Sequence, residues 1–199
     1  MSKTITLSVP DEVYEEMRSH PEINYSELAR ERIGEYLAMF KGREELAPHN
    51  FLLMKDLVFT PAKIEEIHRM LDKKSARTGN LLWVDAVFDL DMLDSLAKFM
   101  HSFPRAHPFE DANKRTMFVC VDAFLRLNRM RLAVRADAKK TTEDEKFFWQ
   151  NANMRKEVAE IRAFIEKRIV PARKPKSVED AVRQSIEENK ALIRRLAAE

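Results

Sequence analysis

The sequence predicts a mainly α-helical protein, with a small N-terminal module that begins with one strand. Apolar residues recur every three or four positions through most of the 199 residues, which is the period of an amphipathic helix. A polar and apolar alternation typical of a strand occurs in KTITLSV, residues 3–9. With three glycines and one cysteine, the chain has little room for glycine-rich phosphate loops, zinc knuckles or disulfides.

Length and composition restrict the number of domains and the compartment. A chain of 199 residues exceeds one typical domain, so we expect a main domain with a small accessory module. We expect a cytoplasmic protein, because the single Cys120 fits a reducing compartment and the N-terminus has no apolar signal core. No run approaches the roughly 20 apolar residues of a membrane span. The net charge of +2 is too small to indicate nucleic-acid binding on its own.

The first 41 residues are predicted to form one strand and two helices. Pro10 ends the strand, and Asp11 caps a helix over residues 11–20. The second helix, over residues 24–40, is capped by Asn24 or Ser26. Because a lone strand leaves its backbone groups unpaired, we expect it to pair with the same strand of a second copy, which makes the protein a homodimer.

This order of elements, with TITLSVPDEVYEEM and YSELARERI, resembles the ribbon-helix-helix domain of repressors and antitoxins. The resemblance covers residues 1–41. It implies that two strands pair across a dimer and enter the DNA major groove, so that Lys3, Thr4 and Thr6 meet base edges. The start of the second helix, at Tyr25 and Ser26, would hold a phosphate through its backbone amides.

The charge of this module opposes DNA binding. Residues 1–41 hold five lysines and arginines against eight aspartates and glutamates. An acidic module binds phosphate backbones poorly. Dimerisation alone therefore remains an alternative to DNA binding for this segment.

The main domain is predicted over residues 51–170, after a linker over residues 42–50 that contains Gly42 and Pro48. Thr60 caps a helix with Pro61 at its first position. His68 on this helix reads as a partly buried structural residue. The segment around Gly79 and Asn80 is interpreted as a turn or a small hairpin, and a helix with a buried face follows over residues 91–105.

The segment HPFEDANKRT, from His107 to Thr116, gathers polar groups ahead of an apolar run. We expect Asp111 to cap a helix whose free amides, with Lys114 and Arg115, form a phosphate cradle. Mg²⁺ would bridge Asp111 to phosphate, and His107 has the pKa range of a general base. The apolar run predicts a central buried helix that holds the cluster rigidly.

The ordered set of residues 107–116 resembles the signature of the Fic/Doc family, and the resemblance covers residues 51–170, an all-helical domain. It implies a nucleotide-dependent transferase that uses ATP and magnesium. His107 would deprotonate a hydroxyl of a protein substrate, Asp111 would hold magnesium, and Asn113 and Arg115 would position the phosphates. Phe109 would anchor the loop, and the candidate for the hairpin, or flap, that aligns the target chain is SARTGNLLW, residues 75–83.

Three positions favour the Doc toxin branch of this family. AMP-transferring members have glycines and a second arginine where this chain has Ala112, Lys114 and Phe118. The resemblance to Doc implies a reversed nucleotide and phosphorylation of a translation factor such as elongation factor Tu. An AMP-transferring enzyme remains an alternative, and so does a DNA-binding regulator with an inactive Fic/Doc domain. Fusion of an antitoxin-like module to a toxin-like one suggests a toxin-antitoxin protein that restrains itself.

The last segment, residues 171–199, is predicted to be a hinge, VPARKPK, followed by one amphipathic helix capped by Ser177. In the Fic/Doc family an inhibitory helix often carries a glutamate. SIEEN, from Ser185 to Asn189, is one residue short of that pattern. Glu188 is thus a candidate inhibitory residue, and packing within the chain or across a dimer is the alternative use of the helix.

Overall fold

The computed structural model describes residues 11–21, 23–27, 29, 55–88, 91–137 and 139–197. The chain divides into two compact units, Met1–Ala47 and Pro48–Glu199. This division falls inside the linker predicted over residues 42–50. Lys3, Thr4 and Thr6, and the strand that would carry them, lie outside the described residues.

In the N-terminal unit, helix α1 comprises Asp11–Ser19, and residues 25–27 and 29 are also helical. The amide of Asn24 resolves which residue caps the second helical segment. Its Oδ1 accepts a hydrogen bond from the backbone N–H of Glu27 at 3.2 Å, and its Nδ2 donates to Glu27 Oε2 at 3.0 Å. Asn24, rather than Ser26, is therefore the cap. Tyr25 and Ser26 lie in the first turn.

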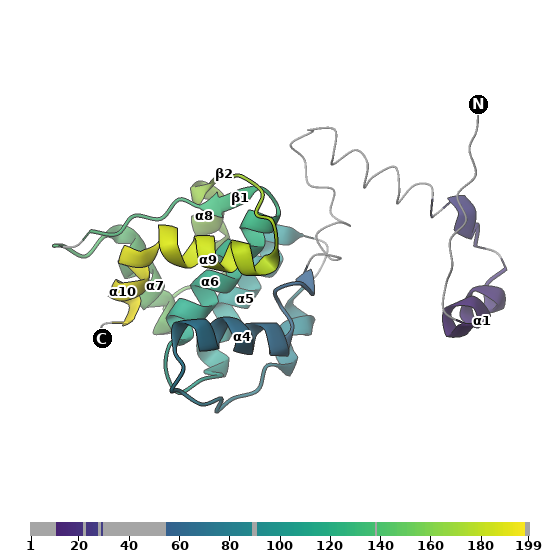
Figure 1. Cartoon of the computed structure of the whole chain (residues 1–199), viewed down its shortest axis with the longest axis horizontal. Coiled ribbons are helices and arrows are strands. Elements are labelled where there is room, and N and C mark those ends of the chain that lie inside the picture. Colours follow the sequence, from purple (N-terminus) through teal and green to yellow (C-terminus); the bar gives the residue numbers. More distant parts are fainter. Residues whose placement is uncertain are drawn as a thin grey trace. The chain divides into compact units, whose positions relative to one another are not determined.

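The C-terminal unit is mainly helical, as the sequence predicts (Figure 1). Its described elements, in chain order, are α4 (Pro61–Leu71), the 3-10 helix η1 (Leu82–Val87), α5 (Met92–Ala106), α6 (Asn113–Leu127), β1 (Met130–Leu132), α7 (Glu143–Ala152), α8 (Val158–Arg168), β2 (Ile169–Pro171), α9 (Val178–Glu188) and α10 (Lys190–Ala197). Among the described residues, no helix is long and apolar enough to cross a membrane.

Helix α6 is the centre of this unit. Every residue from Thr116 to Leu127 is buried, which confirms the predicted central helix. Helices α4, α5, α9 and α10 all pack against α6 (Figure 1). Because its sides are covered along its length, α6 presents its N-terminal end, where the polar motif lies, from a rigid position.

Local capping signals were predicted correctly. The hydroxyl of Thr60 accepts from Lys63 N at 3.3 Å, and Pro61 is the first residue of α4. The hydroxyl of Ser177 accepts from Asp180 N at 3.1 Å at the start of α9. Short side chains that bond to amides three residues ahead are signals within one turn of helix, so a single sequence reveals them.

Two predictions about the unit were wrong. It is not all-helical, because β1 and β2 form an antiparallel pair in which Arg131 lies opposite Val170. The predicted tail helix is two helices, α9 and α10, that break at Asn189. The side-chain amide of Asn189 donates to Ser185 O at 2.9 Å and to Asp122 Oδ2 at 3.3 Å, which caps α9 and holds the junction against α6.

The segment around Gly79 and Asn80 is not a hairpin. Asn80 Oδ1 accepts from Leu82 N at 2.7 Å, and Trp83 Nε1 donates to Asn80 O at 2.8 Å. These bonds turn the chain into η1, so residues 82–87 form a 3-10 helix instead of a returning strand.

Candidate active site

The motif loop connects α5 to α6 and has a left-handed residue at each end. His107 is the C-cap of α5 with φ of 42°, and Ala112 is the N-cap of α6 with φ of 59°. The backbone N–H of His107 donates to Phe103 O at 3.1 Å, whereas its side chain is exposed. The imidazole is therefore available to solutes while its backbone is fixed by the end of α5.

The predicted cap of α6 was displaced by one residue. Ala112, not Asp111, is the N-cap, and it makes no side-chain capping bond. Asp111 Oδ1 instead accepts from the N–H of Ala112, immediately before the helix. The left-handed backbone at Ala112 explains the shift. A residue in this conformation is not helical, so α6 begins at Asn113, one residue later than the composition indicates. A left-handed alanine is less favourable than a left-handed glycine.

The first turn of α6 holds a hydrogen-bond donor without a partner among the described residues, although Arg115 Nη2 is already paired with Asp111. Thr116 N donates to Ala112 O at 2.8 Å, so the amides before Thr116 precede the first intrahelical bond. The Arg115 side chain is 14% exposed, and its buried Nε has no hydrogen-bond partner among the described residues. Lys114 Nζ lies 5.2 Å from the centroid of the Trp149 ring. The helix start and Arg115 can therefore accept an anion, whereas Lys114 is directed toward α7.

Asn113 closes the loop on itself. Its Nδ2 donates to Phe109 O at 2.6 Å, and its Oδ1 accepts from Phe109 N at 3.1 Å. Both ends of the amide are used, so Asn113 fixes the backbone of the motif. Contact between Asn113 and a nucleotide remains a prediction.

His68 contacts three parts of the site through its buried ring: the motif loop, helix α6 and the segment before η1. Its ring stacks on buried Phe109, with centroids 3.8 Å apart and an interplanar angle of 3°. Its Nδ1 is 3.1 Å from Thr116 Oγ1 in α6, and its Nε2 is 2.7 Å from Ser75 Oγ. His68 is 2% exposed. The structural role predicted for this histidine is confirmed, and the structure specifies it: His68 joins α4, the motif loop and the segment before η1.

The segment of residues 76–79, within the predicted flap, lies directly against the motif. Arg77 and Phe109 form an antiparallel β-bridge. Further backbone bonds join Thr78 N to Pro108 O at 3.0 Å, Gly79 N to Pro108 O at 3.1 Å and Glu110 N to Ala76 O at 3.1 Å. The segment thus lies along the motif loop and is bonded to its backbone, and its use as a flap for a target chain remains a prediction.

Gly79 is required where this segment meets the loop. A Cβ atom at residue 79 would lie 2.7 Å from Ala106 O and 2.9 Å from both His107 O and Pro108 Cα. These neighbours are backbone atoms that cannot rotate away. Any larger residue at this position would separate the segment from the histidine loop.

Asp111 is the motif carboxylate that was predicted to hold magnesium. Its side chain is 68% exposed and lies 3.3 Å from Arg115 Nη2. Among the described residues, no three His, Cys, Asp or Glu side chains gather to hold a metal by themselves. Mg²⁺ commonly binds through one or two carboxylates with water and substrate phosphates, and the single exposed carboxylate of Asp111 fits that mode.

Glu188 does not lie at the motif. Its Oε2 accepts from Arg126 Nη2 at 2.9 Å. Arg126 is eleven residues beyond Arg115 in α6, or about 16 Å along the helix axis. The partner of Glu188 is thus at the far end of α6, and the geometry gives no support to an inhibitory contact between Glu188 and the motif.

The buried position of His68 predicts how stability varies with pH. Burial lowers the pKa of His68 from its ordinary 6.5, although the bond to Ser75 and the nearby Asp72 oppose this shift. Below about pH 6.5 the unfolded chain therefore binds a proton at His68 that the folded chain does not. The free energy of unfolding consequently decreases as the pH falls. In His68→Gln the decrease in stability between pH 7 and pH 5 should be smaller, as measured by denaturant unfolding. An equal pH dependence in both proteins would contradict this prediction.

Sequence reasoning placed Thr116 in the motif and Ser75 and Gly79 in the flap, but it missed the contacts that Ser75 and Thr116 make with His68 and the close approach at Gly79. His68 and Thr116 are 48 positions apart, and no local pattern links them. The glycine was a possible signal: with only three in the chain, one at residue 79 indicates a close backbone approach.

Comparison with known proteins identifies the N-terminal region. A family model described as a ribbon-helix-helix protein matches residues 5–57. The match runs past residue 41, where the predicted module ended. No curated protein and no solved structure matches the chain. The match thus indicates a ribbon-helix-helix module in the N-terminal region, and the family resemblance of residues 107–116 remains a prediction.

Proposed function

We propose that the C-terminal unit is a Doc-like transferase that phosphorylates a hydroxyl side chain of a protein, using Mg-ATP. One observation carries this proposal: the exposed His107 precedes a helix start whose Arg115 has unused hydrogen-bonding capacity. A base and an anion-binding helix end in one rigid loop are the two elements that in-line phosphoryl transfer requires.

In this mechanism, His107 accepts the proton of the substrate hydroxyl. The hydroxyl oxygen bonds to the terminal phosphorus as the bond from that phosphorus to the oxygen of the leaving ADP breaks. The amides of the first turn of α6 and Arg115 hold the negative phosphoryl oxygens. Asp111 would hold Mg²⁺ through its exposed carboxylate, and the ion would supply positive charge to offset the charge of the nucleotide. His107 then releases its proton to solvent.

The three positions that differ from AMP-transferring relatives support phosphate transfer. Phe118 is fully buried, so no cation reaches the site from the position of the second arginine. Ala112 keeps the left-handed backbone that a glycine would adopt, but with a Cβ. Without the second clamp, the terminal phosphate is free to face the acceptor. AMP transfer remains the alternative within this reaction class.

The second candidate function is that of a dimeric DNA-binding regulator. The match of residues 5–57 to a ribbon-helix-helix family favours it. Proteins of this architecture pair their strands across a dimer and place them in the major groove. We propose that this module dimerises the chain and binds DNA, with Lys3, Thr4 and Thr6 toward the bases and Tyr25 and Ser26 toward a phosphate. The combined chain would then be a self-regulating toxin-antitoxin protein.

Labelled ATP distinguishes these functions. The purified chain is incubated with a cell lysate and either γ-labelled or α-labelled ATP, and labelled protein is identified by mass spectrometry. We expect label from the γ position, on serine, threonine or tyrosine of a translation factor. Label from the α position alone would replace phosphorylation by AMP transfer. No label from either position, together with sequence-specific DNA binding, would leave the regulator as the function.

A further inference from the structure

Charge is segregated along the chain. Residues 129–197 contain eighteen lysines and arginines and eleven aspartates and glutamates, whereas the net charge of the whole chain is +2. Residues 1–41 are net negative, with five basic and eight acidic residues. The positive charge of the protein thus belongs to the C-terminal unit, away in sequence from the ribbon-helix-helix module.

An open groove of about 1110 Å³ lies in this basic region. Its walls are the segment of residues 133–144, the last turn of α8 and the junction between α9 and α10. The apolar part of the lining consists of Ala133, Val134, Ala136, Ala191 and Leu192. No aromatic residue of the described chain lines the groove, so it offers no ring on which a nucleobase stacks.

Three of the four carboxylates that the structure describes in the groove are paired with a cation, and Asp137 is bonded to backbone amides, which carry no charge. Each has a cation or a backbone amide as its partner: Asp144 accepts from Arg168 Nε at 2.7 Å, Asp137 from Lys139 N at 2.7 Å, Glu188 from Arg126 Nη2 at 2.9 Å, and Glu143 from Lys146 Nζ at 2.9 Å. The three ion-paired acids therefore cancel little of the charge of the remaining cations in the groove, whereas Asp137 keeps its negative charge.

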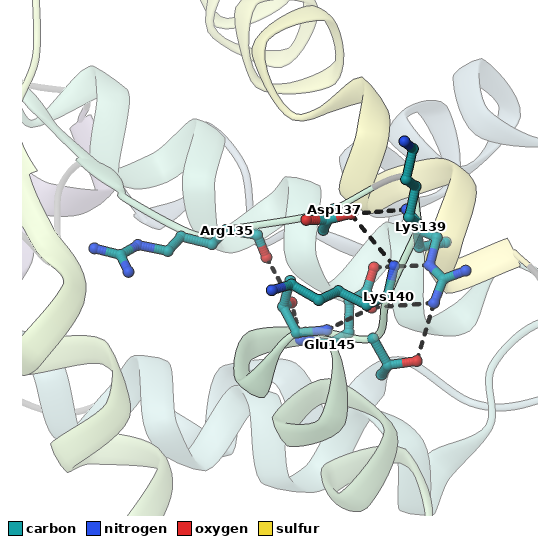
Figure 2. A network of polar contacts seen from close by, with 8 residues as sticks. Arg135, Asp137, Lys139, Lys140 and Glu145 are labelled. Carbon is teal, nitrogen blue, oxygen red and sulfur yellow. Dashed lines mark hydrogen bonds and ion pairs between the residues drawn. The ribbon is translucent and has the colours of Figure 1, made fainter.

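Three cations remain. Arg135, Lys140 and Lys167 line the groove, are exposed, and make no side-chain hydrogen bond or ion pair with any described residue. In Figure 2 the guanidinium of Arg135 extends away from the polar network of the loop. The groove thus presents positive charge that nothing in the described structure uses.

The loop that carries two of these cations is held in place. Asp137 Oδ1 accepts from the backbone N–H of Lys139 at 2.7 Å and of Lys140 at 3.3 Å (Figure 2). At the other end of the loop, Arg195 Nε from α10 donates to Glu145 Oε1 at 2.9 Å. Because these bonds restrict Asp137, Lys139 and Lys140 before any ligand arrives, less conformational entropy is lost on binding.

We propose that this groove binds the phosphate backbone of double-stranded DNA through Arg135, Lys140 and Lys167. The inference rests on the DNA-binding part of the proposed function. The acidic N-terminal module needs cations from elsewhere in the chain to neutralise phosphates, and the groove supplies them. Unpaired cations without stacking rings suit a duplex, whose bases are enclosed, better than a single strand.

The salt dependence of DNA binding tests the proposal. Binding of the full chain to a fluorescent duplex is measured by anisotropy over a series of salt concentrations. In Arg135→Gln/Lys140→Gln/Lys167→Gln, the slope of log K against log salt should be smaller by about 2 to 3, since each neutralised phosphate contributes about 0.9. Affinity at low salt should fall at least tenfold.

A matched control removes the same charge elsewhere in the unit. Lys63→Gln/Lys156→Gln/Arg162→Gln replaces cations that are paired with Glu66, Glu160 and Asp91, none of which lines the groove. It should bind DNA like the wild type, and circular dichroism of both variants verifies folding. Equal losses in both variants, or no duplex binding by the wild type, would overturn the proposal.

Competition with a polyglutamate peptide tests whether the partner of the groove is an acidic protein instead of DNA. If the peptide binds with the same sensitivity to the groove variant and the duplex does not, the groove is a site for acidic protein and the DNA inference fails. Phosphate transfer from labelled ATP is measured in parallel on the groove variant. If the groove variant keeps both phosphate transfer and wild-type affinity for DNA, the proposed role of the groove is refuted and the proposed enzymatic function is not.

Discussion

His107→Ala is expected to reduce phosphate transfer from γ-labelled ATP by about 10²- to 10⁴-fold, the usual contribution of a general base. The side chain is exposed at the end of α5, and its removal takes away the proton acceptor without disturbing packing. Binding of Mg-ATP, measured by calorimetry, should change little, because the phosphate contacts belong to the helix start and Arg115.

His101→Ala provides a control on the same helix. His101 is partly buried, and burial lowers its pKa, but it lies outside the motif loop. This variant should keep its transfer activity. Transfer that persists at the wild-type rate in His107→Ala would remove the histidine from the mechanism, and the chain would then act without this base.

Arg126→Met is expected to lower the free energy of unfolding of the C-terminal unit by about 3–5 kcal/mol, the usual cost of leaving one member of a buried ion pair behind. Arg126 and Asp122 are both buried, with Nε of Arg126 2.8 Å from Asp122 Oδ2. Methionine preserves much of the volume but leaves the carboxylate without its cation. Urea unfolding followed by circular dichroism measures the loss.

Two further variants isolate the charge as the cause. Asp122→Asn/Arg126→Met removes both charges and should recover part of the lost stability. Lys146→Met breaks an exposed pair with Glu143 and should change stability by no more than about 0.5 kcal/mol. A loss below about 1 kcal/mol in Arg126→Met would show that Asp122 needs no cation, because its other donors suffice.

The sequence predicts the features of this fold that depend on neighbours in the chain. Thr60, Pro61 and Ser177 act within one helical turn, and the apolar run after residue 116 can only be a buried helix. The displaced cap at Ala112 shows the limit of such signals. Composition indicates that a helix begins near Asp111. The first helical residue is set by the left-handed backbone at Ala112, and an alanine gives no sign in the sequence that it adopts this conformation.

Contacts between distant segments escaped prediction. The strand pair of β1 and β2 has three residues on each side, too few to show a period of two. The stacking of His68 on Phe109 joins segments that only the packing of α4 on α6 brings together. The site was therefore predicted as a set of motif residues with a flap over residues 75–83, whereas the contacts that join these segments to each other and to α4 required three dimensions.

The bond between Asn189 and Asp122 has a consequence for how the protein can be shortened. The region after residue 170 was predicted as a separate hinge and helix, yet Asn189 and Glu188 complete the polar partners of Asp122 and Arg126 in α6. An expression clone that stops at residue 170 would leave these groups without partners and would expose the core once covered by Leu192 and Leu196. Such a truncated product should be recovered in inclusion bodies, whereas a piece that comprises Pro48–Glu199 keeps the whole compact unit.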